Sequence, residues 1–138
     1  MIDSVTLPNW QPTLRVVPMP ADTPHRLRGW ATFQFPREIV VSPAIDWRSG
    51  FPYSIFDIYR HYIGSANSER FPTYFSLDVT TFKTFDIIGR KWDLGLQFFN
   101  LTGHFNPRDV ISVAGTPQFG EFSNSFGVTL GGYMRVRW

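Results

Sequence analysis

The sequence predicts an all-β fold, an antiparallel meander of about five long strands. Three observations indicate this fold. Apolar and polar residues alternate with a period of two in one segment after another, as they do in a strand with one apolar face. No long window carries the apolar spacing of an amphipathic helix. The connections between the alternating segments are short and long in turn, and short turns join antiparallel neighbours.

The first two predicted strands cover residues 26–35 and 39–56. In the first strand, Leu27 and Phe33 lie on one face, and mostly polar residues lie on the other. The second strand alternates in the same way through Pro43. Because proline has no N–H group to donate to a neighbouring strand, Pro43 predicts a bulge or an irregular pairing at this point.

Three further strands are predicted at residues 73–86, 91–101 and 123–138. Each has an apolar row opposite a row that is rich in polar residues. In the fourth strand, for example, Trp92 alternates with Asp93. Every predicted strand is longer than the five or six residues, roughly, that are typical of soluble proteins.

The connections have a regular order. Residues 36–38 and 87–90 are short turns, whereas residues 57–72 and 102–122 are long loops with glycine and proline. The segment 1–25 is rich in proline, which is not tolerated inside a strand, so we expect it to be an irregular loop.

Strand length and loop order together favour a transmembrane β-barrel. Outer-membrane barrels have short turns on one side and long loops on the other, and their strands need about 9–11 residues to span the bilayer. In such a barrel the apolar rows contact lipid and the polar rows line the lumen. Alternation alone does not decide which face is covered. A soluble antiparallel β-sandwich or small barrel acting as a binding module is therefore the alternative prediction.

Composition excludes several other classes. The chain has 138 residues, a net charge of +2 and no cysteine, so one domain is expected, without disulfides or thiolate metal sites. Lysine and arginine are scattered, and therefore no nucleic-acid partner is expected. No apolar stretch is long enough for a transmembrane helix, and the first residues do not have the pattern of a signal peptide.

No residues form a pattern typical of catalysis. His25, His61 and His104 are far apart, without a spacing that suggests metal ligands, and no nucleophile motif or phosphate-binding loop is present. We therefore expect a protein that is not an enzyme and that uses no cofactor and no metal.

Charged residues of the polar rows are the candidate lumen-facing residues. One interpretation is that they guide a polar substrate through a pore. The other is that they form cross-strand charge pairs. The candidates are Arg26, Arg28, Asp46, Arg48, Asp78, Asp93, Arg135 and Arg137.

Five segments, in this order, resemble the C-terminal end of the TonB-dependent outer-membrane receptors, most of all the Oar-like receptors. They are TPHRLRGWATFQFP, VVSPAIDWRSGFPYSIFD, NSERFPTYFSLDVTTFKTF, LQFFNLTGHFNPRDV and FGEFSNSFGVTLGGYMRVRW. The resemblance implies the C-terminal portion of a barrel of roughly two dozen strands with an internal plug. It also implies a place in the bacterial outer membrane, a role in energised transport, and a chain that is a fragment of a receptor.

The resemblance implies several partners. These are the remainder of the barrel and the plug, the outer-membrane lipid, and the barrel-assembly machinery. TonB would be contacted only through segments that this chain lacks. In outer-membrane barrels a terminal aromatic residue preceded by alternating apolar residues serves as the assembly signal, and the matching positions are Val128, Leu130, Met134, Val136 and Trp138.

The aromatic residues have two interpretations. Rings near strand ends form girdles at the two membrane interfaces of a barrel, whereas in a soluble fold they form the core. The candidates are Trp30, Trp47, Trp92, Tyr133 and Trp138.

Overall fold

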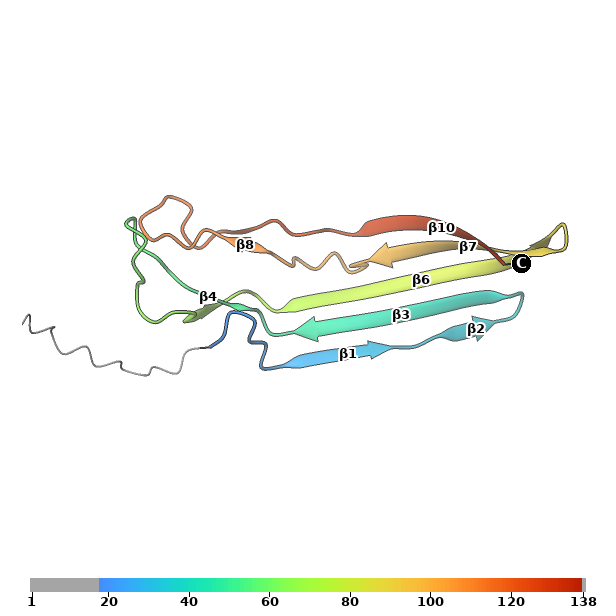
Figure 1. Ribbon diagram of the computed structural model, residues 1–138, viewed down its shortest axis with the longest axis horizontal. Coiled ribbons are helices and arrows are strands. Elements are labelled where there is room, and N and C mark those ends of the chain that lie inside the picture. Colours follow the sequence, from blue (N-terminus) through green and yellow to red (C-terminus); the bar gives the residue numbers. More distant parts are fainter. Residues whose placement is uncertain (1–17, 138) are drawn as a thin grey trace, which may run out of the picture.

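The computed structural model describes residues 18–137, and they form an all-β structure dominated by one antiparallel sheet. The predicted meander is confirmed. Figure 1 shows the long strands side by side in a single layer, with β1 and β10 at its two edges. The sheet is open and does not close into a barrel. Its strands, in spatial order, are β1 (Arg26–Trp30), β3 (Ile39–Arg48), β6 (Tyr74–Ile87), β7 (Arg90–Phe99) and β10 (Thr129–Arg137), with β2 (Phe33–Phe35) also paired with β3.

Pro43 explains why the first predicted strand, 26–35, is divided into β1 and β2. The register is the same on both sides of the interruption, with Trp30 opposite Ala44 and Phe33 opposite Val41. The Ala31 N–H donates to the Pro43 carbonyl at 3.1 Å. Proline cannot return that hydrogen bond, and the ladder is broken there. The irregular pairing is confirmed, and there is no bulge.

The second predicted strand, 39–56, is longer than the strand that the structure shows. β3 ends at Arg48, and the chain then forms a short pair within the loop, β4 (Pro52–Tyr53) with β5 (Glu69–Arg70). Gly50 allows this change of partner. A Cβ atom on Gly50 would lie 1.8 Å from the Phe71 carbonyl oxygen, so only glycine lets the two loop segments approach this closely.

The last predicted strand, 123–138, also begins too early. β10 starts at Thr129, and the residues before it pair inside the loop as β9 (Phe122–Ser123) with β8 (Asp109–Val110). The other two predicted strands, 73–86 and 91–101, differ from β6 and β7 by one or two residues at their ends. The alternation of apolar and polar residues continues into the loops, and it does not indicate where a strand changes its pairing partner.

The two ends of the sheet differ, as the loop order predicts. At one end, which we call the turn end, Ile88 and Gly89 form a two-residue turn with φ values of 52° and 67°. Positive φ at both positions is the geometry of a type I′ hairpin turn. The turn at 36–38 lies at the same end. The long loops, 49–73 and 100–128, lie at the opposite end, the loop end (Figure 1).

The register assigns each strand residue to one of two faces, because residues directly opposite each other share a face. All eight candidate lumen-facing residues lie on one face, which we call the polar face. The other, the apolar face, carries the rows that were predicted to be apolar. Its members include Leu27, Val41, Ile45, Trp47, Leu77, Val79, Trp92, Leu94, Leu96, Phe98, Leu130, Met134 and Val136.

No layer covers the apolar face. None of the described side chains on the apolar face is buried, and Leu94 and Leu130 are 45% and 61% exposed. The largest fully buried side chain is that of Asp93 on the polar face. The alternative in which the aromatic residues form a core is therefore wrong for the described residues. No helix within residues 18–137 is long and apolar enough to cross a membrane.

Of the four candidate girdle residues that the structure describes, two lie where a girdle requires them. Trp47 is next to the loop end and Trp92 is near the turn end, both on the apolar face. Trp30 is opposite Ala44, and Tyr133 is opposite Gly95, so both lie at mid-height on the polar face. Trp138 lies outside the described residues.

Candidate functional site

The two long loops pack against each other above the loop end of the sheet. The Phe56 N–H donates to the Ser112 carbonyl at 2.9 Å, and the Ala114 N–H donates to the Phe56 carbonyl at 2.8 Å. Three rings from the two loops, those of Tyr53, Phe71 and Phe122, also contact one another edge to face, with centroids 5.3 to 6.0 Å apart. The loops therefore form a structured cap over one end of the sheet.

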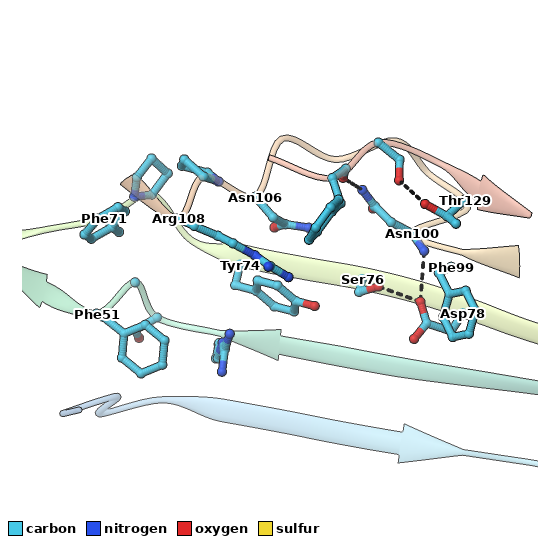
Figure 2. A pocket seen from close by; sticks show the side chains of 17 residues that line it. Phe51, Phe71, Tyr74, Ser76, Asp78, Phe99, Asn100, Asn106, Arg108 and Thr129 are labelled. Carbon is cyan, nitrogen blue, oxygen red and sulfur yellow. Dashed lines mark hydrogen bonds between the residues drawn. The ribbon is translucent and has the colours of Figure 1, made fainter. Parts of the chain in front are cut away.

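A cavity of about 710 Å³ lies between this cap and the polar face, a volume typical of small-molecule sites. Strands β3, β6 and β7 provide its floor, and the loops provide its walls (Figure 2). We call it the loop-end pocket. Its charged and polar lining comes from Arg48, Ser49, Tyr74, Ser76, Asp78, Asn100, Asn106, Arg108 and Thr129.

Asn106 fixes one wall of the loop-end pocket. Its side-chain amide donates to the Phe75 carbonyl at 2.7 Å, and its Oδ1 accepts the Phe75 N–H at 3.0 Å. The side chain thus pairs with β6 in the way a neighbouring strand would. The Asn106 N–H also donates to the Ser125 hydroxyl at 2.8 Å, and the residue is 9% exposed.

Asn100 holds the beginning of the same loop in place. Its φ is 49°, a left-handed conformation that asparagine tolerates better than most residues. Its Nδ2 donates to the carbonyls of His104 and Phe126, each at 2.9 Å. Its backbone N–H donates to Asp78, which also accepts the Ser76 hydroxyl (Figure 2). Asp78 was predicted to face a lumen, and in this structure its carboxylate anchors the loop.

Two arginines stack on aromatic rings at the loop-end pocket. The Arg48 guanidinium lies 4.3 Å from the Tyr74 ring centroid and 4.7 Å from that of Phe51. The Arg108 guanidinium lies 4.1 Å from the Phe126 centroid, and its side chain extends toward Tyr74 (Figure 2). Neither arginine forms an ion pair within the described part of the chain. Arg48 was a sequence candidate, whereas Arg108 sits in a loop where no periodicity marks it.

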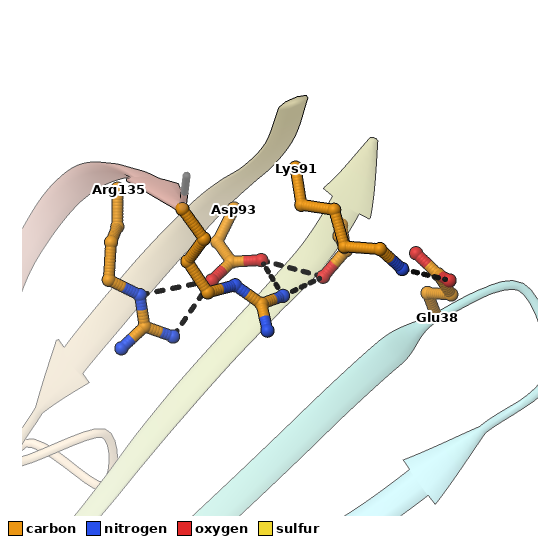
Figure 3. A network of polar contacts seen from close by, with 6 residues as sticks. Glu38, Lys91, Asp93 and Arg135 are labelled. Carbon is orange, nitrogen blue, oxygen red and sulfur yellow. Dashed lines mark hydrogen bonds and ion pairs between the residues drawn. The ribbon is translucent and has the colours of Figure 1, made fainter. Parts of the chain in front are cut away.

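A second polar cluster, the Asp93 network, lies on the polar face near the turn end (Figure 3). Arg135 donates to Oδ2 of Asp93 through Nε at 3.0 Å and Nη2 at 2.8 Å. Arg137 and the Thr84 hydroxyl donate to Oδ1 at 2.8 and 2.6 Å. The Asp93 side chain is 0% exposed beneath them, and Lys91 pairs with Glu38 beside the cluster at 3.4 Å.

A third cluster repeats this arrangement at the β1 edge. Asp46 accepts from Arg26 at 2.8 Å and from Arg28 at 3.2 Å. Six of the eight candidate residues therefore form cross-strand charge pairs, the second interpretation of these residues. That they line an aqueous lumen stays a prediction.

The candidate assembly-signal residues fall in three places. Leu130, Met134 and Val136 lie on the apolar face of β10. Val128 precedes β10 and is 55% exposed. Trp138 lies outside the described residues, and the signalling role stays a prediction.

Two of the three histidines make hydrogen bonds to neighbouring loop residues. The His104 ring is 3.0 Å from the Asn106 side chain, and the His61 ring is 3.2 Å from Asp57. Asp57 also accepts the N–H groups of His61 and Tyr59, each at 2.8 Å, and the hydrogen bond from the His61 N–H is the main cause of a lowered pKa at this carboxyl. Among the described residues there is no group of histidine and acidic side chains arranged to hold a metal ion.

Comparison with known proteins adds no family to this geometry. No family model, no curated protein and no solved structure matches this chain. A functional conclusion therefore rests on the two faces of the sheet and on the loop-end pocket.

Proposed function

We propose that this chain forms part of the wall of an outer-membrane β-barrel of the TonB-dependent receptor type and is not an enzyme. Its place is the bacterial outer membrane, and its role is in energised uptake of a substrate. The observation that carries the proposal is the apolar face, which extends over all five long strands and has no covering layer. In water such a face is an aggregation hazard, whereas in a bilayer it contacts acyl chains.

Strand length supports the proposal. β3 and β7 have 10 residues each. At a rise of about 3.4 Å per residue they extend about 34 Å, and a tilt of about 40° reduces this to a height of about 26 Å. The apolar band of outer-membrane barrels is about 25 Å tall. Trp47 and Trp92 lie near the two ends of the apolar face, where interfacial aromatic residues are expected.

The open edges define the partners that the proposal requires. β1 and β10 each have one neighbour in the sheet, so each leaves a row of backbone groups unpaired. In hydrocarbon each unpaired group costs several kcal/mol. Further strands must therefore flank both edges. The remainder of the barrel would supply these strands, and the plug would fill the lumen. The barrel-assembly machinery and lipid are the other partners, and TonB would be contacted by other segments.

Single cysteines test which face meets lipid, because the chain has no cysteine of its own. Leu94→Cys and Leu130→Cys place a label on the apolar face, and Thr80→Cys and Gln97→Cys place one on the polar face. After reconstitution into liposomes, a fluorophore at the first two sites should be quenched by a lipid-dissolved nitroxide. At the other two sites it should be quenched by aqueous iodide.

One result would refute this assignment. If the chain is a monodisperse monomer in plain buffer, with all four labels quenched by iodide alone, the membrane proposal is wrong. A soluble binding module, the alternative prediction, would then be favoured.

A further inference from the structure

We propose that the loop-end pocket binds a small aromatic anion, a molecule with a carboxylate or phosphate group attached to a planar ring. This inference goes beyond the barrel proposal and does not depend on it. It rests on the contacts inside the pocket, which are the same whether the outer surface of the sheet meets lipid or water.

The charge of the pocket favours an anion. Arg48 and Arg108 both line it, and within the described residues no carboxylate or other acceptor receives a hydrogen bond from either guanidinium. Asp78 is the only acidic residue in the described lining. It already accepts hydrogen bonds from Ser76 and Asn100, at 2.6 and 2.9 Å. The pocket therefore carries an excess of positive charge.

The stacking of the arginines leaves their donors available. A guanidinium that lies flat on a ring uses its face, and its five N–H donors point outward in the plane. Arg48 is stacked on Tyr74 and Phe51, and Arg108 is stacked on Phe126. The ring therefore orients the N–H donors of each guanidinium before any ligand binds. A carboxylate or phosphate group can accept two parallel hydrogen bonds from such a guanidinium.

The remaining walls favour a planar ring beside the anionic group. Phe71 and Phe99 line the same cavity as the three rings on which the arginines stack, those of Phe51, Tyr74 and Phe126. A volume of about 710 Å³ accommodates a ring with its substituents, while an inorganic anion would leave most of it empty. Aromatic pairs in offset or edge-to-face contact contribute about 0.5–1.5 kcal/mol beyond the area they bury.

The pocket is built before a ligand binds. Asn106 joins the second long loop to β6, and Asn100 joins it to Asp78 and links its two ends through the carbonyl of Phe126. Both asparagines are buried, at 9% and 6% exposure. A preformed wall lowers the ordering cost of binding, so the pocket does not have to assemble around its ligand.

Calorimetric titration of the full chain in detergent tests the proposal with three probes. These are phenyl phosphate, inorganic phosphate, which lacks the ring, and benzyl alcohol, which lacks the charge. Phenyl phosphate should bind at least about tenfold more tightly than either of the others. It alone can both accept hydrogen bonds from the two guanidinium groups and contact the aromatic rings.

Variants assign the binding to the pocket. Arg48→Gln and Arg108→Gln should each weaken phenyl phosphate binding about tenfold or more. Phe126→Leu should weaken binding of phenyl phosphate and leave that of inorganic phosphate nearly unchanged. Arg28→Gln is the matched control, because Arg28 lies on the same face but outside the pocket, and it should bind as the parent chain does. Far-UV circular dichroism confirms that each variant is folded.

Two results would overturn the proposal. One is that phenyl phosphate binds no more tightly than benzyl alcohol. The other is that Arg28→Gln loses as much affinity as the two pocket variants, which would indicate a diffuse effect of charge. Either result leaves the quenching pattern of the cysteine labels unchanged, so failure of the pocket proposal is separate from failure of the barrel proposal.

Discussion

Asp93 and Asp46 show how the same residue type acts differently at two depths on one face. Each carboxylate receives two arginines from an adjacent strand. Asp93 is fully covered, whereas the Asp46 side chain is 22% exposed. Water competes for the hydrogen bonds of Asp46 and screens its charge, so the Asp93 network contributes more to stability.

The isosteric changes Asp93→Asn and Asp46→Asn test this difference. Asp93→Asn removes the charge and places an N–H₂ donor among guanidinium donors. We expect it to lower the free energy of unfolding by about 1–3 kcal/mol. Asp46→Asn should cost less than about 1 kcal/mol. Denaturant titration of the two variants measures both values. Equal losses would contradict the assigned role of burial.

The ionisation of Asp57 should make the stability of the first long loop depend on pH. Its pKa is lowered, mainly because the His61 N–H donates to the ionised carboxylate, with a further backbone donor from Tyr59. A lowered pKa means that the loop is stabilised above the pKa of the unfolded chain, about 3.9. That stabilisation is lost as the pH falls through the lower pKa of the folded state.

Carboxyl-carbon NMR of Asp57 measures this shift. The resonance should titrate below about pH 3.9, and amide exchange of residues 57–61 should accelerate as it does so. In Asp57→Ala the same amides should exchange rapidly at every pH. Titration of Asp57 above its unfolded value would show that the backbone hydrogen bonds are not formed.

Among the strands, β7 and β10 depend on a contact between a glycine and a ring. Gly95 is directly opposite Tyr133, and a Cβ atom on Gly95 would lie 2.4 Å from that ring and 2.7 Å from the Thr81 carbonyl oxygen. The glycine leaves the space that the ring occupies. Gly131, on the same face of β10, has no atom within 4 Å of such a Cβ position.

Two alanine substitutions separate space from backbone propensity. Gly95→Ala should destabilise the sheet by about 1–3 kcal/mol, because the ring and the β6 backbone must both move. Gly131→Ala should be neutral or stabilising by up to about 1 kcal/mol, since it only restricts the unfolded chain. Thermal unfolding compares the two. A stable Gly95→Ala variant would mean that Tyr133 does not lie over β7.

The β6–β7 turn carries a residue that its geometry does not favour. Ile88 has a φ of 52° and is 96% exposed, so a β-branched side chain adopts a left-handed conformation without burying its surface. Ile88→Asn would create the Asn-Gly pair preferred in type I′ turns and should raise stability by about 1 kcal/mol. Ile88→Val keeps the β-branch and should give no gain. Denaturant midpoints of the two variants measure the difference.

For the molecule as a whole, the open sheet predicts self-association. In a single chain the two edge strands leave backbone groups unpaired, and in water the apolar face is also exposed. Both features favour association with other copies, in water and in detergent. In micelles the chain should have a protein mass well above the 15.9 kDa of one copy, by sedimentation with detergent matching. Hydrogen exchange should be slowest in β6, the central strand, whose two neighbours β3 and β7 are themselves paired on their far sides. A protein mass of one chain with equally protected β1 and β10 would contradict this expectation.

Some features of the loop end were not open to prediction from the sequence. Alternation continues past Arg48 and before Thr129, so the predicted strands extended into segments that pair as β4 with β5 and as β8 with β9. Arg108 and Asn106 lie in a loop without periodicity, and their roles depend on contacts with Phe126 and β6. Local pattern carries no information about such distant partners.

The sequence by itself determined the all-β class, the meander, the order of short and long connections, and the face that each strand residue takes. It could do so because these properties depend on neighbours along the chain and on the pleat, which places alternate residues on opposite sides. Only the tertiary structure decided that six charged residues pair with one another across strands, that Asp78 anchors a loop, and that Arg48 and Arg108 meet aromatic rings around a cavity. Those outcomes depend on register and loop packing, which join residues that are far apart in the sequence.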